Sequence, residues 1–171
     1  MRVSKPATVI ALFLFSNFSG KAQQEVKVDY SAFLNISKEL FDYRASRLID
    51  IEKFNVYSSE ENTIILDTRS KGAYDKIHIE GAIHLNFSDF TEDTLAMVVK
   101  DKNTRILIYC NNNFKSSRKA LMNKMTPLAL NIPTFINLYG YGYTNIYELD
   151  EYLDENDPRV TFEISDKKQI K

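Results

Sequence analysis

The feature that most constrains the fold is a set of short apolar segments separated by stretches of helical composition. Thr63–Asp67 and Arg105–Tyr109 are the clearest, because each is too short for a helix and carries consecutive apolar residues rich in isoleucine. Such runs are typical of strands that are covered on both faces of a sheet. Ala82–Asn86 and Asn145–Leu149 are two further short segments that predict strands. Strands that alternate with helices predict crossover connections, and therefore an α/β fold with a mostly parallel sheet and helices on both faces.

Helices are expected where apolar residues recur at helical spacing or where a polar residue can cap a first turn. The expected helices are residues 31–48 with Ser31 or Ser37 as N-cap, Lys71–Lys76 after Ser70, a helix beyond Ser88 or Asp89, Lys115–Met125, and a helix from Pro133 onward. Residues 49–51 are expected to form a short strand or turn, and residues 55–62 a loop.

Polar side chains stand at the carboxyl ends of three predicted strands, at Asp67, Asn86 and Cys110. In parallel α/β sheets the functional site lies beyond these ends, so the three side chains are expected to converge. Cys110 is the only cysteine, which excludes an internal disulfide. A polar turn and the predicted helix 115–125 follow it, and a helix N-terminus favours a thiolate. We therefore expect the pKa of Cys110 to be lowered.

The first 22 residues have the pattern of a secretory signal peptide. Arg2 and Lys5 precede the apolar run Ala7–Phe15, and Gly20 and Ala22 supply a small-residue cleavage site. The run is short for a bilayer span, so we favour cleavage after Ala22 over an uncleaved anchor helix. The sequence predicts an exported protein, periplasmic or secreted, without stable membrane insertion after removal of the signal.

The remaining composition is that of one ordinary domain with its own core. The 171 residues include 22 basic and 23 acidic residues, a net charge of −1. Removing residues 1–22 takes away three basic residues and no acidic residue, which leaves 19 basic and 23 acidic residues and a net charge of −4. This balance gives no reason to expect a nucleic-acid partner.

Four motifs, in order along the chain, resemble those of the rhodanese family. They are Asp67–Arg69, His78–Leu85, Tyr109–Cys110 and Gly142–Leu149, and the resemblance spans about residues 45–153. It implies a three-layer fold with a central parallel five-stranded sheet. The expected organisation of the whole chain is a signal peptide at 1–22, a lead-in and helix at 23–44, a rhodanese-like domain at 45–155 and a charged tail at 156–171.

The resemblance also implies sulfurtransferase chemistry. Cys110 is the expected carrier of sulfane sulfur as a persulfide, with a thiosulfate-like or persulfide anion as donor and a thiol or other thiophilic group, small or on a protein, as acceptor. No cofactor or metal is implied. The expected loop around the sulfur comprises Asn111, Asn112, Asn113, Phe114, Lys115, Ser116 and Arg118. Asp67 and Arg69 are expected to support it, and we favour a structural role for this pair over a catalytic one.

The sequence departs from the family pattern in two places. Asn113 stands where a loop glycine is usual, and asparagine is the residue that best replaces glycine in the left-handed region. Glu151 and Tyr152 replace a pair of glycines after the last strand. Three other interpretations therefore stay open for Cys110: a buried structural cysteine, a non-catalytic module that binds a partner or a small anion, and a thiol redox sensor.

Rival chemistries have weaker support. A phosphatase of this fold needs Cys-x5-Arg so that the arginine can bind phosphate, but the sixth residue after Cys110 is Ser116. The spacing of His78 and His84 fits no zinc pattern. The run Tyr139–Tyr143, with its intervening glycines, fits either a site wall or aromatic residues that close the core.

Overall fold

A computed structural model describes residues 28–165 of the chain. The predicted signal peptide and the final lysine-rich residues 166–171 lie outside the described residues. Within the described part, no helix is both long enough and apolar enough to cross a membrane.

The centre of the protein is a five-stranded sheet in the order β1-β7-β5-β2-β4. Each neighbouring pair in this sheet is parallel. The α/β fold with a central parallel five-stranded sheet is therefore confirmed. Its strands are β1 (Leu48–Ile49), β2 (Thr63–Asp67), β4 (Ile83–His84), β5 (Arg105–Tyr109) and β7 (Ile146–Leu149).

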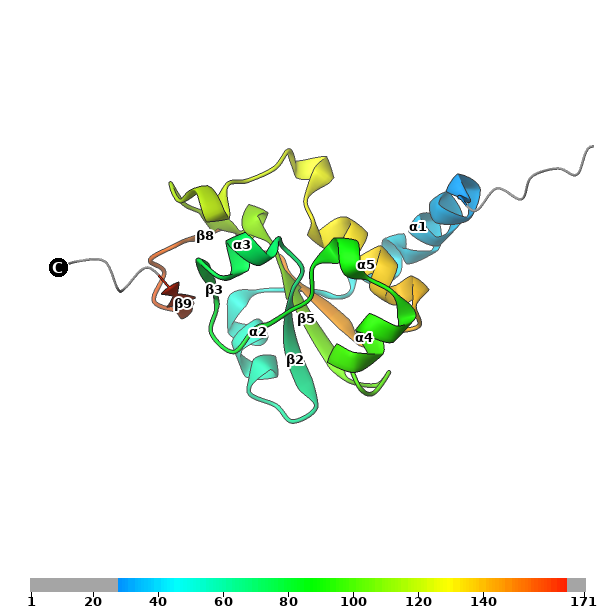
Figure 1. Ribbon diagram of the computed structural model, residues 1–171, viewed down its shortest axis with the longest axis horizontal. Coiled ribbons are helices and arrows are strands. Elements are labelled where there is room, and N and C mark those ends of the chain that lie inside the picture. The colour runs from blue at the N-terminus through cyan, green and yellow to red at the C-terminus, as the bar shows by residue number, and fades with distance from the viewer. Residues whose placement is uncertain (1–27, 166–171) are drawn as a thin grey trace, which may run out of the picture.

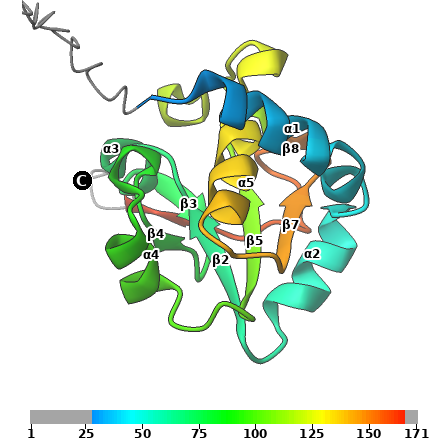
Figure 2. The same ribbon diagram turned by 90° about the vertical axis from the view of Figure 1, so that its right-hand side faces the viewer.

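Helices cover both faces of the sheet (Figure 1). The covering helices are α1 (Tyr30–Ala45), α2 (Ile51–Ser58), α4 (Glu92–Val98) and α5 (Asn131–Gly140). Helices α1, α4 and α5 lie on one face and α2 lies on the other, and Figure 2 shows α5 crossing in front of β5 and β7.

Strand β5 connects the two halves of the core because its side chains alternate between the faces. Ile106 and Ile108 pack with residues of α1, α4 and α5, whereas Leu107 and Tyr109 pack with residues of α2. All four side chains are almost fully buried. Burial on both faces explains why this strand is a continuous apolar run in the sequence.

Two small sheets extend the fold beyond the five-stranded sheet. Strands β3 (Ile77–Ile79) and β9 (Phe162–Ile164) pair antiparallel, and β6 (Phe114–Lys115) and β8 (Leu153–Asp154) pair parallel. The expected charged tail therefore contributes a strand as far as residue 164. The ring of Phe162 packs edge-on against that of Phe114, with centroids 5.0 Å apart.

The predicted helix over Lys115–Met125 is wrong. This stretch contains only β6 and the single 3₁₀ turn η3 (Lys119–Leu121), followed by η4 (Thr126–Leu128). An amphipathic helix needs a buried face, and Leu121 is the only residue of the segment 116–128 that is buried. Hydrogen bonds from asparagine side chains, and not the backbone hydrogen bonds of an α-helix, keep this segment in place.

The predicted loop over residues 55–62 is also wrong in its first half, where α2 continues to Ser58. The side chain of Asp50 caps α2 by accepting a hydrogen bond from the Lys53 N–H at 2.8 Å. The N-caps of α1 and α4 are Asp29 and Thr91, not the serines or Asp89 that we expected.

The helix predicted over residues 31–48 ends at Ala45, and Leu48 belongs to β1. The predictions for Ser70 and Pro133 agree with the structure. Ser70 caps α3 (Lys71–Tyr74) by accepting a hydrogen bond from the Ala73 N–H. Pro133 lies in the first turn of α5, which begins at Asn131.

Candidate functional site

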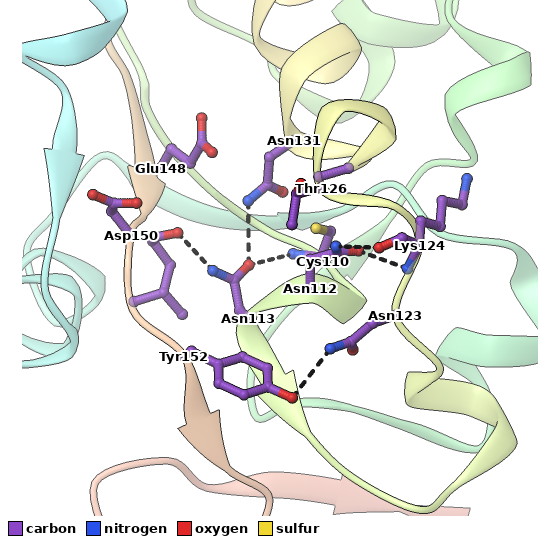
Figure 3. Close-up of a pocket in the computed structure, with 12 residues that line it drawn as sticks. Cys110, Asn112, Asn113, Asn123, Lys124, Thr126, Asn131, Glu148, Asp150 and Tyr152 are labelled. Atoms are coloured by element: carbon purple, nitrogen blue, oxygen red, sulfur yellow. Dashed lines mark hydrogen bonds between the residues drawn. The ribbon is translucent and has the colours of Figure 1, made fainter.

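Cys110 directly follows β5 and lies at the carboxyl edge of the central sheet, as predicted. Its side chain is 2% exposed and lies between a cavity of about 430 Å³ and a second one of about 180 Å³. The 3₁₀ turn η2 (Asn111–Asn113) follows it. Figure 3 shows the sulfur between this turn and the first residues of α5. Residues that line the larger cavity include Asn112, Lys124, Asn131, Glu148, Asp150 and Tyr152.

The pKa of the Cys110 thiol is raised, which corrects our expectation that it is lowered. Burial is the main cause, because it disfavours the charged thiolate. Backbone N–H groups of Asn131, Asn112 and Leu130 near the sulfur act in the opposite direction, because they favour the thiolate. A helix N-terminus does therefore face the thiol, but it belongs to α5 and not to the segment after Cys110. The effect of this helix N-terminus on the pKa of Cys110 is smaller than the effect of burial.

We expect alkylation of Cys110 by iodoacetamide to be slow at neutral pH. A raised pKa means a smaller thiolate fraction at pH 7, so the rate should climb as pH rises through and beyond the value of an ordinary cysteine thiol. The measurement is the second-order rate against pH, with a short unstructured cysteine peptide as reference. A midpoint below that of the peptide would contradict the dominance of burial.

Asn113 does not adopt the left-handed conformation that we expected in place of a glycine. Among the described residues other than glycine, Asn62 alone has a positive φ. The Asn113 side chain is instead buried and joins three segments. Its Oδ1 accepts hydrogen bonds from the Cys110 N–H at 2.8 Å and the Asn131 Nδ2 at 3.2 Å, and its Nδ2 donates to the Leu149 carbonyl at 2.7 Å. The asparagine thus fixes the backbone of Cys110 against β7 and α5.

Replacement of Asn113 by alanine should destabilise the protein by about 2–3 kcal/mol, because it leaves the Cys110 N–H and the Leu149 carbonyl buried without partners. Denaturant unfolding followed by circular dichroism would measure the change. Asn103→Ala is the matched control, since Asn103 is exposed, and its effect should stay within about 0.5 kcal/mol. Equal effects of the two substitutions would contradict the role given to Asn113.

The other two loop asparagines hold the segment that covers the thiol. The Asn111 Nδ2 donates to the Met122 carbonyl at 3.0 Å. Asn112 bonds to both backbone groups of Lys124, because its Nδ2 donates to the carbonyl at 2.8 Å and its Oδ1 accepts from the N–H at 3.0 Å. Cys110, Asn112 and Lys124 line both cavities, so this paired contact lies between them.

Asp67 and Arg69 form a buried ion pair behind the loop. Arg69 Nη2 lies 2.5 Å from Asp67 Oδ2, and the two side chains are 3% and 0% exposed. The Tyr109 hydroxyl also donates to Asp67 Oδ2 at 2.5 Å. The remaining Arg69 donors bind Asn111 Oδ1 and the carbonyls of Ala120 and Ile77. All five N–H groups of Arg69 are therefore engaged, and the pair braces the loop.

Four residues of the predicted loop do not line either cavity at Cys110. Phe114 is fully buried in the core, and Lys115 is exposed within β6. The Ser116 hydroxyl donates to Glu155 at 2.5 Å, and Arg118 Nε pairs with the same carboxylate at 3.0 Å. Lys124, a residue that no sequence motif marked, lines both cavities instead.

Sequence reasoning also missed Glu148, which lines the larger cavity and is 5% exposed. Arg44 of α1 binds it through two hydrogen bonds, Nε at 2.8 Å and Nη2 at 2.6 Å. Burial raises the pKa of Glu148, and the hydrogen bonds from Arg44 oppose that effect. A glutamate within the apolar strand Ile146–Leu149 was the signal that could have identified it.

Asn86, predicted to converge on the site, lies away from it. Its side chain accepts a hydrogen bond from the Ser88 N–H and caps η1 (Phe87–Asp89).

The two histidines, His78 and His84, are in structural positions. The ring of His78 stacks on that of Tyr74, and His84 Nε2 lies 2.8 Å from the Arg69 carbonyl oxygen.

The aromatic run Tyr139–Tyr143 begins in the last turn of α5, closes the core and lies outside the cavities at Cys110. Tyr143 is fully buried, and its hydroxyl donates to the Val99 carbonyl at 3.3 Å. The ring of Tyr139 packs on that of Tyr43, with centroids 5.6 Å apart. The Tyr141 hydroxyl donates to the Phe90 carbonyl at 3.3 Å.

Comparison with known proteins places these observations in a family. The family model of the rhodanese-like domain matches residues 39–155, which is more than half of the chain. No significant match is found among curated proteins. A solved protein of Bacillus halodurans is 20% identical, with a TM-score of 0.46 and coverage of 68% of this chain and 74% of that one. A rhodanese of E. coli solved with anions is 22% identical, with a TM-score of 0.40 and coverage of 60% and 98%. The chain belongs to the rhodanese-like domain family.

Proposed function

We propose that the chain is a sulfurtransferase in which Cys110 carries sulfane sulfur as a persulfide. The observation that supports this most directly is the position of Cys110 between two cavities, with backbone N–H groups of Asn131, Asn112 and Leu130 near enough to its sulfur to favour the thiolate. Such groups stabilise an anion in place without reorganisation. A buried cysteine with only a packing role needs neither a cavity nor donors around its sulfur.

The reaction consists of two balanced transfers. The Cys110 thiolate attacks the sulfane sulfur of the donor, a new S–S bond forms, and the donor fragment leaves with the electron pair of the broken bond. The acceptor thiolate then attacks the outer sulfur, and the Cys110 sulfur leaves as a thiolate. No external oxidant or reductant is consumed.

In this proposal, the raised pKa of the free thiol sets a requirement for donor binding. Only a small fraction of Cys110 is thiolate at neutral pH, so binding of the donor must accompany loss of the thiol proton. The side-chain amides of the loop asparagines are already fixed by their own hydrogen bonds. The backbone N–H of Asn112 and those at the start of α5 are therefore the protein groups available to stabilise the thiolate and then the persulfide.

Mass spectrometry of the intact protein provides the test. Incubation of the chain without residues 1–22 with a sulfane donor should add one sulfur atom, and peptide mapping should place it on Cys110. Addition of a thiol acceptor should then remove the added sulfur. Failure to load sulfur from thiosulfate and from organic persulfides alike would refute the proposal.

The burial of Cys110 favours one alternative, a non-catalytic module that binds a partner or a small anion, over a thiol redox sensor. A thiol that is 2% exposed with a raised pKa reacts slowly with large electrophiles. Peroxide treatment distinguishes a sensor, which should accumulate a stable sulfenic acid or mixed disulfide at Cys110.

A phosphatase is disfavoured, because Arg118 pairs with Glu155 and does not line the cavities at Cys110.

We further propose that the protein works after export, in the periplasm or outside the cell. The pattern of residues 1–22 supports this proposal. Its acceptor is a thiol or another thiophilic group, and no cofactor takes part. Appearance of the protein in a periplasmic or culture fraction, with an N-terminus near residue 23, is the expected result.

A further inference from the structure

Segment 122–128, which forms part of the wall around Cys110, turns its large apolar side chains to the solvent. Met122, Met125 and Leu128 are 63%, 72% and 63% exposed, and they line neither cavity. The polar residues of the segment that line the larger cavity are Asn123, Lys124 and Thr126. Figure 1 shows this stretch, in yellow, on the outside of the molecule. Apolar side chains that gather on a protein surface, in place of the polar ones beside them, are typical of an interaction site.

Hydrogen bonds keep the backbone of this segment in place although its side chains are exposed. The Asn111 side chain binds the Met122 carbonyl, and the Asn112 side chain binds both backbone groups of Lys124. The Leu128 N–H donates to the Met125 carbonyl at 2.8 Å. A partner that covers the segment therefore orders few groups on binding, and the unbranched methionine side chains can adapt to its shape.

The charge of this part of the chain has one sign. Residues 102–147 contain six basic residues and no acidic residue, so all 23 acidic residues of the chain lie outside this stretch. Lys119 and Lys124 are exposed, and neither forms an ion pair within residues 28–165. A partner surface with acidic residues is complementary to these two lysines, whereas a basic one is repelled.

The exposed carboxylate of the larger cavity belongs to a different wall. Asp150 follows β7, and Figure 3 shows it on the opposite side of the Cys110 sulfur from Lys124. The basic character is therefore a property of the wall that segment 122–128 forms, and not of the whole rim.

Two other occupants fit these observations less well. A second copy that docks by the same face would bring its own Lys119 and Lys124 toward those of the first, and like charges repel. A membrane surface would match the combination of apolar and basic side chains, but lipid headgroups carry no group that accepts sulfur. A protein with a thiol satisfies both the surface and the proposed chemistry behind it.

We propose that the outer face of segment 122–128 docks the protein that accepts sulfur from Cys110, and that this partner presents its thiol within an apolar surface edged by acidic residues. The inference rests on the proposed sulfurtransferase function and names the class of its acceptor. The acceptor thiolate attacks the outer sulfur of the Cys110 persulfide, the S–S bond to Cys110 breaks, and Cys110 leaves as a thiolate with the electron pair. The transferred sulfur, with any proton that it carries, becomes the outer sulfur of a persulfide on the acceptor.

Sulfur transfer from persulfide-loaded protein to synthetic thiol peptides tests the inference. The first peptide has one cysteine flanked by leucines and glutamates. Three matched peptides replace the glutamates by glutamines, the glutamates by lysines, or the leucines by serines, and free cysteine is the small acceptor. Rates are compared per thiolate, because neighbouring glutamates raise the pKa of the peptide cysteine.

The glutamate peptide should accept sulfur about fivefold faster than the glutamine peptide at low ionic strength, the effect expected of exposed ion pairs. The lysine peptide should be the slowest of the three that carry leucine. Raising the ionic strength to about 1 M should remove the difference between the glutamate and glutamine peptides, because salt screens exposed charges.

Substitution of the apolar side chains tests the surface itself. Met122→Ser, Met125→Ser and Leu128→Ser together should lower the ratio of the glutamate-peptide rate to the free-cysteine rate about tenfold, as expected for the loss of apolar burial. The control is Met97→Ser, which removes an equally exposed methionine, at 70%, from α4 outside both cavities. It should leave the ratio unchanged.

Substitution of the lysines tests the charge complementarity. Lys119→Gln with Lys124→Gln should make the glutamate and glutamine peptides equally good acceptors. The matched control is Lys38→Gln with Lys53→Gln, two exposed lysines of α1 and α2, which should leave the preference for glutamate in place.

The outcomes separate this inference from the proposed function. If all peptides accept sulfur at one rate per thiolate, or if the triple substitution leaves the ratio unchanged, the docking surface is wrong and the sulfurtransferase function stands. A dimer in sedimentation velocity, or binding to phosphatidylglycerol vesicles, that the triple substitution abolishes would assign the surface to a second copy or to a membrane and overturn the inference. If no donor loads Cys110, the proposed function fails, and the acceptor class fails with it.

Discussion

Replacement of Cys110 by serine should reduce sulfur transfer by about a thousandfold or more, because a hydroxyl is a far weaker nucleophile and forms no persulfide. The fold should persist, since serine occupies less volume and its oxygen can accept the same backbone N–H groups. The measurements are the rate of sulfur release from the donor and the mass of the protein after incubation.

The control for this change is Ser117→Ala, which alters an exposed residue of the covering segment without touching either cavity. Its rate should match that of the unmodified protein. Sulfur that is still found on the Cys110→Ser protein, or transfer at an unchanged rate, would show that the chemistry does not pass through this residue.

Replacement of Asp67 by alanine should destabilise the protein by about 3–5 kcal/mol, because it leaves the Arg69 guanidinium buried without its counter-charge. For a chain of this size that corresponds to a fall in Tm of roughly 6–20 °C. Thermal and denaturant unfolding would measure it. The substitution should also speed alkylation of Cys110, since Arg69 holds Asn111 and the Ala120 carbonyl in place.

An exposed ion pair provides the comparison. Lys71 and Asp75 form an i,i+4 pair whose side chains are 66% and 51% exposed, so Asp75→Asn should change stability by less than about 1 kcal/mol. The double substitution Asp67→Leu with Arg69→Met removes both charges and should recover part of the loss. Equal effects of Asp67→Ala and Asp75→Asn would contradict the bracing role of the buried pair.

The central sheet was predictable because its evidence is local. Strands β2 and β5 are continuous apolar runs, and the parallel order follows from their alternation with helices. The position of Cys110 at a strand end was predictable for the same reason. The pairing of β3 with β9 depends on contacts more than 80 residues apart, which no local pattern of short, partly exposed strands can reveal.

The electrostatic state of the site was not predictable, because it depends on burial. The sequence shows Lys115 and Arg118 near Cys110, but neither lines a cavity beside it, and Lys124 lines both cavities instead. The helix that faces the sulfur begins at Asn131, 21 positions further along the chain. Motif spacing locates a nucleophile, whereas its pKa depends on groups brought near it by the tertiary fold.

The strand β9 has a consequence for the extent of the folding unit. The family match ends at residue 155, yet Phe162 packs on Phe114, which lies four positions after Cys110 and is completely buried. The loop that carries the nucleophile is therefore supported from behind by residues outside the region that defines the family. A protein shortened to residues 39–155 would keep all four sequence motifs. It would lose Phe162, which packs against Phe114 in the loop after Cys110.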